Sequence, residues 1–235
     1  TLSNYVASMY GIPVVFHEDY DWLENDRISK LSQKFQRFPW ERRLPTLSAA
    51  GVRFILTSEA IRIPELRLVQ MITNPNNIRY FLYRNENCAG MAVFTSNSII
   101  ESDSNKLLNI LTNSNFDPCT NVLLEHPTVG AGSHAIANAS IKLIKSTASS
   151  ASYQVVTDKP GFLIFSEPYI PGWKWIIDGW RVDSVRANFA FQAVAVPAGK
   201  HLIDRNYMPA SFVLGTAISL SALVFLVVAA VIRKS

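Results

Sequence analysis

The sequence predicts an α+β protein with a mixed α/β N-terminal part, an antiparallel β-sandwich and a single C-terminal transmembrane helix. Three observations support this fold class. Residues 210–232 form an uncharged apolar run, helix and strand patterns alternate up to residue 128, and turn-separated strand patterns fill residues 134–207. We therefore expect a mixed α/β domain over residues 1–128, a sandwich over 134–207 and a membrane helix over 210–232.

The apolar run near the C-terminal end carries the most information. Residues 210–232 read ASFVLGTAISLSALVFLVVAAVI. Because a helix rises 1.5 Å per residue, about 20 apolar residues cross the hydrocarbon core of a bilayer. A buried helix of a water-soluble protein would normally be shorter or carry a polar stripe. The run therefore predicts a cell-membrane protein with a single span in this chain, and the lipid bilayer as a partner.

The residues that flank this helix predict its orientation. Arg233 and Lys234 follow the run, and the positive-inside rule places such residues in the cytoplasm. The main domain is then extracytoplasmic, although the chain starts at Thr1 without a signal-peptide pattern. One explanation is that upstream transmembrane helices are missing from this chain. The alternative is a tail-anchored protein whose domain lies in the cytosol.

Helical spacing of apolar residues predicts three helices in the N-terminal part. The first covers residues 27–38, with Asp26 as its N-cap and Pro39 as its stop. A second helix over residues 41–50 tolerates Pro45 only in its first turn. A third covers residues 105–111, with an N-cap among Ser102, Asp103 and Ser104.

Strand patterns occupy the remainder of this part and nearly all of the next one. Short β-branched or aromatic runs predict strands at residues 11–16, 52–57, 66–72, 78–83, 91–95 and 121–125. After a turn-rich linker at residues 127–133, strands are expected at residues 136–144, 153–157, 162–165, 173–177, 180–185, 189–196 and 201–207. The Asp178-Gly179 pair predicts a type I′ hairpin turn between two of them.

Composition and motifs exclude several classes of function. The net charge of +4 is not concentrated in any segment, which argues against nucleic-acid binding. The sequence contains no nucleophile elbow, Walker loop, zinc-protease motif or dinucleotide fingerprint, so we assign no catalytic residue, metal ligand or cofactor. The densest polar cluster, at residues 17–21, could bind a cation or act in acid–base chemistry, but a solvated loop explains it as well.

Cys88 and Cys119 fit neither zinc spacing nor a redox motif. In an oxidising compartment they could form one disulfide, which would stabilise the fold by about 3 kcal/mol in the chain-entropy model. Two ordinary thiols explain the pair equally well.

An aromatic set within the predicted sandwich suggests carbohydrate contact. Tyr169, Trp173, Trp175 and Trp180 lie in one hairpin and the segment before it. On a strand over residues 173–177, Trp173, Trp175 and Ile177 would share one face. Exposed indoles can stack on sugar rings, which would make this a carbohydrate-binding sandwich. The alternative, which we favour, is that this face forms the sandwich core.

Several short motifs in the last part of the chain resemble those of YfhO-like bacterial membrane proteins, a group similar to the GT-C glycosyltransferases. They are SEPYIPGW at residues 166–173, the Asp178-Gly179 hairpin, RAN at 186–188, VPAGKH at 196–201 and YMP at 207–209. Upstream, residues 43–57 resemble a strand of the same proteins. One departure is Arg205-Asn206, where the family usually has a more β-prone pair, and this leaves the end of the last strand open.

The resemblance implies a function for the chain. Such proteins transfer a sugar from a polyprenyl-phosphate donor to an envelope polymer or lipid, with a catalytic carboxylate in an early extracytoplasmic loop. That loop has no counterpart in this chain, so the chain would supply an accessory extracytoplasmic domain and the final span of the enzyme. Its partners would be the upstream transmembrane helices and an envelope glycan or lipid-linked sugar. The alternative is a non-enzymatic bitopic or tail-anchored protein for adhesion or assembly.

Overall fold

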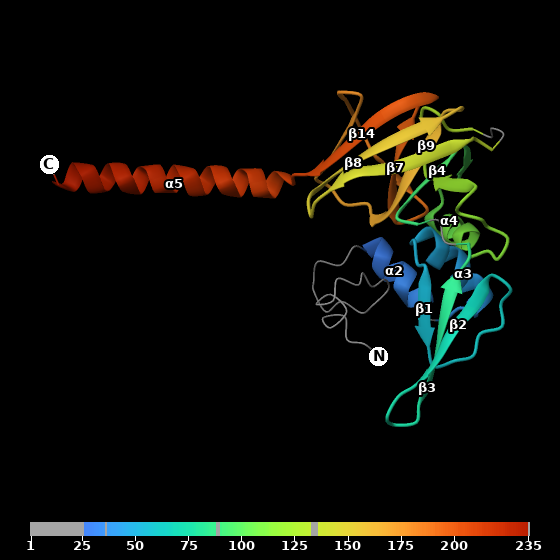
Figure 1. Ribbon diagram of the computed structural model, residues 1–235. Helices are drawn as coiled ribbons and strands as arrows, with labels where there is room; N and C mark the ends of the chain where they lie inside the picture. Colours follow the sequence, from blue (N-terminus) through green and yellow to red (C-terminus); the bar gives the residue numbers. More distant parts are fainter. Residues whose placement is uncertain (1–25, 36, 88–89, 133–135, 235) are drawn as a thin grey trace.

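The computed structural model describes residues 26–35, 37–87, 90–132 and 136–234, and it confirms the α+β fold class. Three short helices and three sheets form the main body, and one long helix leaves it (Figure 1). The helices are α2 (Asp26–Phe35), α3 (Trp40–Ala49), α4 (Ser104–Leu111) and α5 (Ala210–Lys234). The expected strand at residues 11–16 and the polar cluster at residues 17–21 lie outside the described residues.

The first sheet is a small antiparallel unit that projects from the body. It has the order β1-β3-β2, with β1 (Phe54–Thr57), β2 (Leu66–Thr73) and β3 (Arg79–Asn85). Helix α3 covers one face of this sheet, where Leu44 and Leu47 pack against Ile55 and Tyr83. The Tyr83 hydroxyl accepts a hydrogen bond from the Ile61 backbone N–H at 2.8 Å, which fastens the β1–β2 connection to the sheet.

The predicted sandwich is present, and two larger sheets build it. The five-stranded sheet has the order β11-β10-β14-β8-β7, and the six-stranded sheet has the order β4-β9-β13-β12-β6-β5. The strands of the first are β7 (Ala139–Ser146), β8 (Ser150–Thr157), β10 (Trp173–Ile177), β11 (Trp180–Val182) and β14 (Gly199–Tyr207). The strands of the second are β4 (Ala92–Thr95), β5 (Asn97–Ile100), β6 (Asn121–Leu124), β9 (Gly161–Pro168), β12 (Val185–Ala187) and β13 (Phe191–Val196).

Alternating side chains from the two sheets meet in one apolar core. Val155 and Ile203 of the five-stranded sheet pack with Leu163 and Val194 of the six-stranded sheet, and all four are buried. On its other side the six-stranded sheet is covered in part by helices. Leu31 of α2 and Leu107 of α4 belong to a second cluster with residues 189–191.

The sandwich extends beyond the boundaries predicted for it. Strands β4, β5 and β6 precede residue 128, yet they pair within the six-stranded sheet, and β4 lies directly beside β9. The expected division of the main body at residues 128–134 therefore does not separate two sheets. A turn-rich linker marks a surface connection, but it does not reveal which strands pair across it.

A second correction concerns the strand expected at residues 180–185. It is two strands: β11 pairs with β10 in one sheet, and β12 pairs with β13 in the other. The chain thus crosses between the sheets at residues 183–184. Strand periodicity alone does not report such a crossing, because both halves alternate in the same way.

The helix boundaries also differ in detail from expectation. Helix α2 ends at Phe35, and turn-type hydrogen bonds from Arg37 and Phe38 replace its last turn. Pro45 lies beyond the first turn of α3, contrary to prediction. For α4 the N-cap is Asp103, whose carboxylate accepts the backbone N–H groups of Asn105 and Lys106, as a capping residue should.

The hairpin turn at Asp178-Gly179 has the predicted geometry. Both residues have positive φ, 51° and 87°, as a type I′ turn requires. The Asp178 carboxylate accepts the Leu202 backbone N–H at 2.8 Å and lies 2.6 Å from His201 Nδ1. These two hydrogen bonds stabilise the charged form, so the pKa of Asp178 lies below its usual value of 3.8.

The lowered pKa of Asp178 gives an acid-dependent contribution to stability. A carboxylate with a depressed folded-state pKa stabilises the fold above its unfolded pKa, and this stabilisation is lost as pH falls through the folded value. Asp178→Asn keeps the turn and removes the charge. We expect the variant to melt below the wild type at pH 6 and the difference to shrink below about pH 4 in thermal melts. Asp183→Asn, an exposed acid a few residues beyond the turn with no side-chain contact among the described residues, should show no such trend. A pH-independent difference for Asp178→Asn would contradict the assignment.

Candidate functional site

The four aromatic residues predicted to contact sugar do not lie on one surface. Trp175 is 1% exposed and sits in the sandwich core, so the core alternative holds for this residue. Trp180 is 79% exposed at the edge of the five-stranded sheet. Trp173 is half-buried beside Tyr207, with ring centroids 5.2 Å apart. Tyr169 follows β9, on the other sheet. Only Trp180, Trp173 and Tyr169 therefore present surface to a ligand.

Trp173 and Trp175 belong to an aromatic box around a buried arginine. The Arg205 guanidinium lies 4.6 Å from the Trp173 ring centroid and 4.9 Å from that of Phe165, distances typical of cation–π contact. Its two terminal nitrogens donate to the two carboxylate oxygens of Glu167, both at 2.6 Å. The side chain of Arg205 is only 8% exposed. This pair is structural, because little of the guanidinium remains for a ligand.

The last strand, β14, does not end before Arg205. Strand β14 continues through Arg205 and Asn206 to Tyr207, pairing with β10 on one side and β8 on the other. Arg205 can occupy an inward-facing position although it is charged, because it pairs with Glu167. The unusual residue pair at 205–206 therefore does not shorten the strand.

A pocket of about 290 Å³ opens beside Tyr169. Strands β6 and β12 supply its walls, and Tyr169 contributes an aromatic face. Its lining consists of Leu124, Glu125, His126, Thr128, Tyr169, Ser184, Val185 and Arg186. The pocket combines one aromatic ring with hydroxyl, imidazole and charged groups. Such a mixture can stack on a ring and hydrogen-bond its substituents.

Two arginines flank the single carboxylate of this pocket. Glu125 lies 2.5 Å from an Arg27 nitrogen and 3.3 Å from an Arg186 nitrogen. The Arg186 guanidinium also lies 5.0 Å from the centre of the Tyr169 ring. Arg186 lines the pocket together with Glu125, whereas Arg27 contacts Glu125 from outside the lining.

Comparison with known proteins finds a similarity to one family in the C-terminal part of the chain. The family model described as bacterial membrane protein YfhO matches residues 122–219. We refer to residues 122–219 as the YfhO match. Comparisons with curated proteins and with solved structures gave no match. The resemblance noted for the sequence is thus confirmed over this range, whereas residues 43–57, which resemble a strand of the same family, lie outside it.

The YfhO match includes part of α5, a candidate membrane span. The match begins in β6, continues through the remainder of the sandwich and ends within α5. Helix α5 is apolar over Ala210–Arg233 and is not buried in the body. The family and the helix together support membrane localisation.

The RAN motif of the YfhO match has a structural explanation. Arg186 pairs with Glu125, and Ala187 is fully buried. Asn188 adopts a left-handed conformation with φ 47°. Its side-chain oxygen accepts the Leu123 backbone N–H at 2.9 Å, and its own N–H donates to the Leu123 carbonyl at 2.9 Å. The motif thus fastens β6 to β12 and shapes the wall of the Tyr169 pocket.

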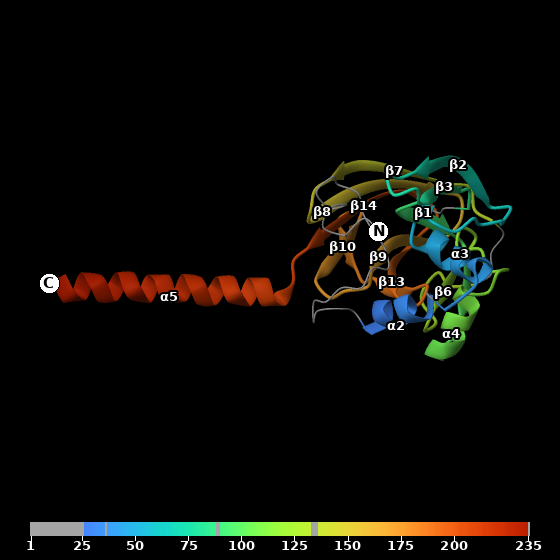
Figure 2. The same ribbon diagram turned by 90° about the horizontal axis from the view of Figure 1, so that it is seen from below.

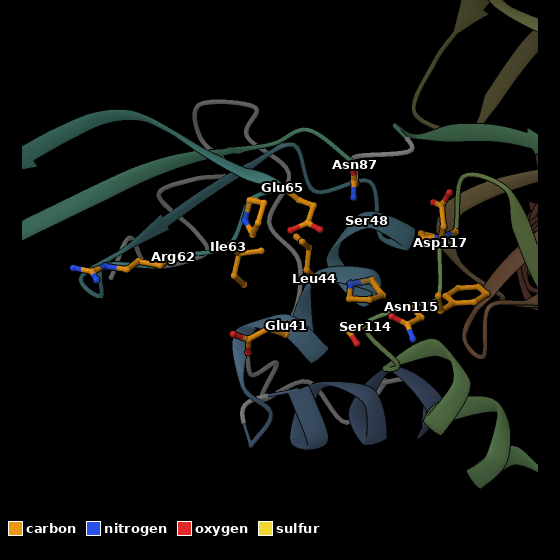
Figure 3. Close-up of a pocket in the computed structure, with 14 residues that line it drawn as sticks. Glu41, Leu44, Ser48, Arg62, Ile63, Glu65, Asn87, Ser114, Asn115 and Asp117 are labelled. Carbon is orange, nitrogen blue, oxygen red and sulfur yellow. The ribbon is translucent and has the colours of Figure 1, made fainter.

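A second pocket, of about 330 Å³, lies between α3 and the loops at residues 62–65 and 114–118 (Figure 3). Figure 3 shows Arg62 extending away from the other labelled side chains. The polar residues of the lining are Glu41, Ser48, Arg62, Glu65, Asn87, Ser114, Asn115 and Asp117. These carboxylates and amides could hydrogen-bond a hydroxylated ligand, but the pocket lies outside the YfhO match.

Neither metal-binding side chains nor the two cysteines add a further site among the described residues. The described residues contain no cluster of three His, Cys, Asp or Glu side chains that could hold a metal ion. Cys88 lies outside the described residues, so its pairing with Cys119 stays a prediction. The Cys119 sulfur lies 3.5 Å from the carbonyl oxygen of Asn87, the residue that precedes Cys88.

Sequence reasoning missed the partners that make the Tyr169 pocket. Glu125 was expected only as the end of a strand, and Arg27 only as part of a helix. Their roles arise because α2, β6 and β12 meet in space. Only the RAN motif and the SEPYIPGW motif pointed to this region from the sequence.

Replacement of Asn188 should separate its role as a hydrogen-bond acceptor from its role as a residue with positive φ. Asn188→Ala removes the acceptor for the buried Leu123 N–H and strains a positive-φ backbone, so we expect a loss of about 2–3 kcal/mol in the free energy of unfolding. Asn188→Gly removes only the acceptor and should be milder by about 1 kcal/mol. Chemical denaturation followed by tryptophan fluorescence measures both values. Equal losses would contradict the role of the left-handed backbone.

The buried pair of Arg205 and Glu167 should show strong coupling. Glu167→Leu leaves an unpaired guanidinium in the sandwich and should cost about 3 kcal/mol of unfolding free energy. Adding Arg205→Met to that variant removes the stranded charge and should recover about half of the loss. The double-mutant cycle is measured by chemical denaturation. Additive losses from the two single changes would show that the pair contributes nothing beyond its separate groups.

Proposed function

We propose that the chain is the extracytoplasmic accessory domain and final membrane span of a polyprenyl-phosphate-sugar-dependent, GT-C-like membrane glycosyltransferase. The catalytic part of such an enzyme would lie outside this chain. The observation that carries the proposal is the continuity of the YfhO match from β6 through the sandwich into α5. A domain joined to its span in this way works at a membrane surface, where a lipid-linked sugar is available.

The Tyr169 pocket is the proposed sugar site. An aromatic ring provides a face for a sugar, and hydroxyls at Thr128 and Ser184 provide hydrogen-bond partners. Arg186 in the lining is the group that would contact the phosphate of a lipid-linked sugar. Residues of this one pocket would thus contact both the sugar and the phosphate.

Trp180 is the proposed contact for an acceptor glycan. Its indole is the most exposed of the aromatic set and stands on an edge strand, where a chain-like ligand can approach from the side. Trp173 is a weaker candidate, since Arg205 and Tyr207 occupy much of its surface. Trp175 is not proposed, because a buried indole cannot stack on a ligand.

The proposed orientation places the body outside the cytoplasm. Arg233 and Lys234 follow the apolar run of α5, and basic residues favour the cytoplasmic side. The upstream transmembrane helices of the same enzyme would deliver the domain across the membrane and pack beside α5. Protease added to intact cells should then digest the body, and digestion only after lysis would refute this orientation.

The sugar site is tested with the full chain in lipid nanodiscs. We expect Tyr169→Ala to weaken binding of a polyprenyl-phosphate hexose about fivefold or more, which corresponds to about 1 kcal/mol. Trp180→Ala should weaken binding of isolated envelope polysaccharide by a similar factor. Both affinities can be measured by microscale thermophoresis, with circular dichroism to confirm that the fold is retained.

Glu41→Gln in the second pocket is the matched control and should leave both affinities unchanged. Absence of sugar binding by the wild type, or loss caused by Glu41→Gln instead, would overturn the site. The complete reading frame tests the wider proposal: hydrophobic spans before Thr1 support it. A frame without them favours the non-enzymatic bitopic or tail-anchored alternative.

A further inference from the structure

The junction between the sandwich and the membrane helix is short and firmly held. Strand β14 ends at Tyr207 and α5 begins at Ala210. The Tyr207 N–H donates to the Ser149 carbonyl at 2.7 Å, and the Met208 N–H donates to the Gly172 carbonyl at 2.8 Å. These two hydrogen bonds therefore fix two turns of the sandwich to residues 207 and 208, just before the helix.

Gly172 allows this close contact. Its φ is 111°, and an added Cβ would lie 3.0 Å from the Pro209 Cα and 3.1 Å from the Tyr207 ring. A larger residue would push the turn off the junction and strain the backbone as well. The turn at residues 147–149, residues 170–174 at the start of β10, and residues 207–209 lie together beside the start of α5. We call this set the collar.

The length of α5 sets the depth of the collar. The uncharged run at residues 210–232 has 23 residues and is about 35 Å long as a helix, a few ångströms more than the hydrocarbon core of about 30 Å. Its first residue, Ala210, therefore reaches the boundary of the hydrocarbon, and residues 207–209 fall in the headgroup layer. The backbone hydrogen bonds bring residues 149 and 172 to the same depth. Both views show α5 extending straight away from this end of the sandwich (Figures 1 and 2).

The side chains of the collar suit the headgroup layer. Trp173 and Tyr207 are amphipathic rings of the kind enriched at membrane interfaces. Ile170 and Met208 are exposed apolar residues, and Lys174 adds a positive charge. The opposite end of the sandwich differs, since its turn at residues 197–200 is Pro-Ala-Gly-Lys.

We propose that the collar is seated in the lipid headgroup layer of the bilayer that α5 spans. Its partner is phospholipid: the apolar and aromatic residues insert between headgroups, and Lys174 lies near their phosphates. This seating fixes the height and tilt of the body above the membrane. The Tyr169 pocket lies close by, because Tyr169 and Gly172 are joined by at most about 11 Å of chain. The proposal does not depend on a glycosyltransferase function.

Site-specific photocrosslinking tests the seating. The full chain carries p-benzoylphenylalanine at Ala148 or Ile170 in the collar, or at Ala198 in the opposite turn, and is reconstituted in phosphatidylcholine nanodiscs. Gly199 pairs with Thr157 and Asn206 with Ser150, so the two ends are about 23 Å apart along β14. All three probe positions are exposed and lie outside the strands, where the probe should not disturb packing.

We expect lipid adducts at positions 148 and 170 to exceed those at position 198 at least tenfold by mass spectrometry. The probe at Phe212 in α5 serves as the control for membrane insertion. Near-equal yields at the three positions, whether low or high, together with adducts at position 212 would overturn the proposal. Low yields would show that the body stands clear of the bilayer, and high yields would show that it lies flat on it.

Discussion

The contact between Arg205 and Glu167 joins the two sheets of the sandwich. Arg205 stands on β14 of the five-stranded sheet and Glu167 on β9 of the six-stranded sheet, so their two hydrogen bonds span the core. Aromatic rings surround the guanidinium and exclude water, which strengthens the attraction and makes a lost partner costly. Because β14 continues almost directly into α5, this link helps to fix the six-stranded sheet relative to that helix.

A short segment after β9 connects the pocket beside Tyr169 to the start of α5. Glu167 lies near the end of β9, just before Tyr169, and Tyr169 is followed by the turn that Gly172 holds against the helix junction. A pocket fixed in this way keeps one height above the membrane. That arrangement would suit the lipid-linked sugar that we propose as ligand, since both partners would then move in the same plane.

Much of the local structure could be predicted because its causes are local. The Asp178-Gly179 turn, the Asp103 cap and the alternation from Trp173 to Ile177 depend on backbone preferences and on neighbours close in sequence. The membership of the sheets could not be predicted in this way. Strands β4 to β6 join the sandwich through pairing with strands far along the chain, and the strand pattern of residues 180–185 gives no sign of the crossing between sheets.

The sequence by itself determined that one segment is long and apolar enough to cross a bilayer and that strands dominate the region before it. Transfer of an uncharged apolar helix from water into an apolar environment is favourable whatever the rest of the fold. Side-chain alternation follows from the pleat of any strand. The tertiary structure decided which charges meet: Glu125 with Arg27 and Arg186, and Arg205 with Glu167. Ion pairs between residues far apart in the chain depend on the packing of the whole molecule, and no periodicity records them.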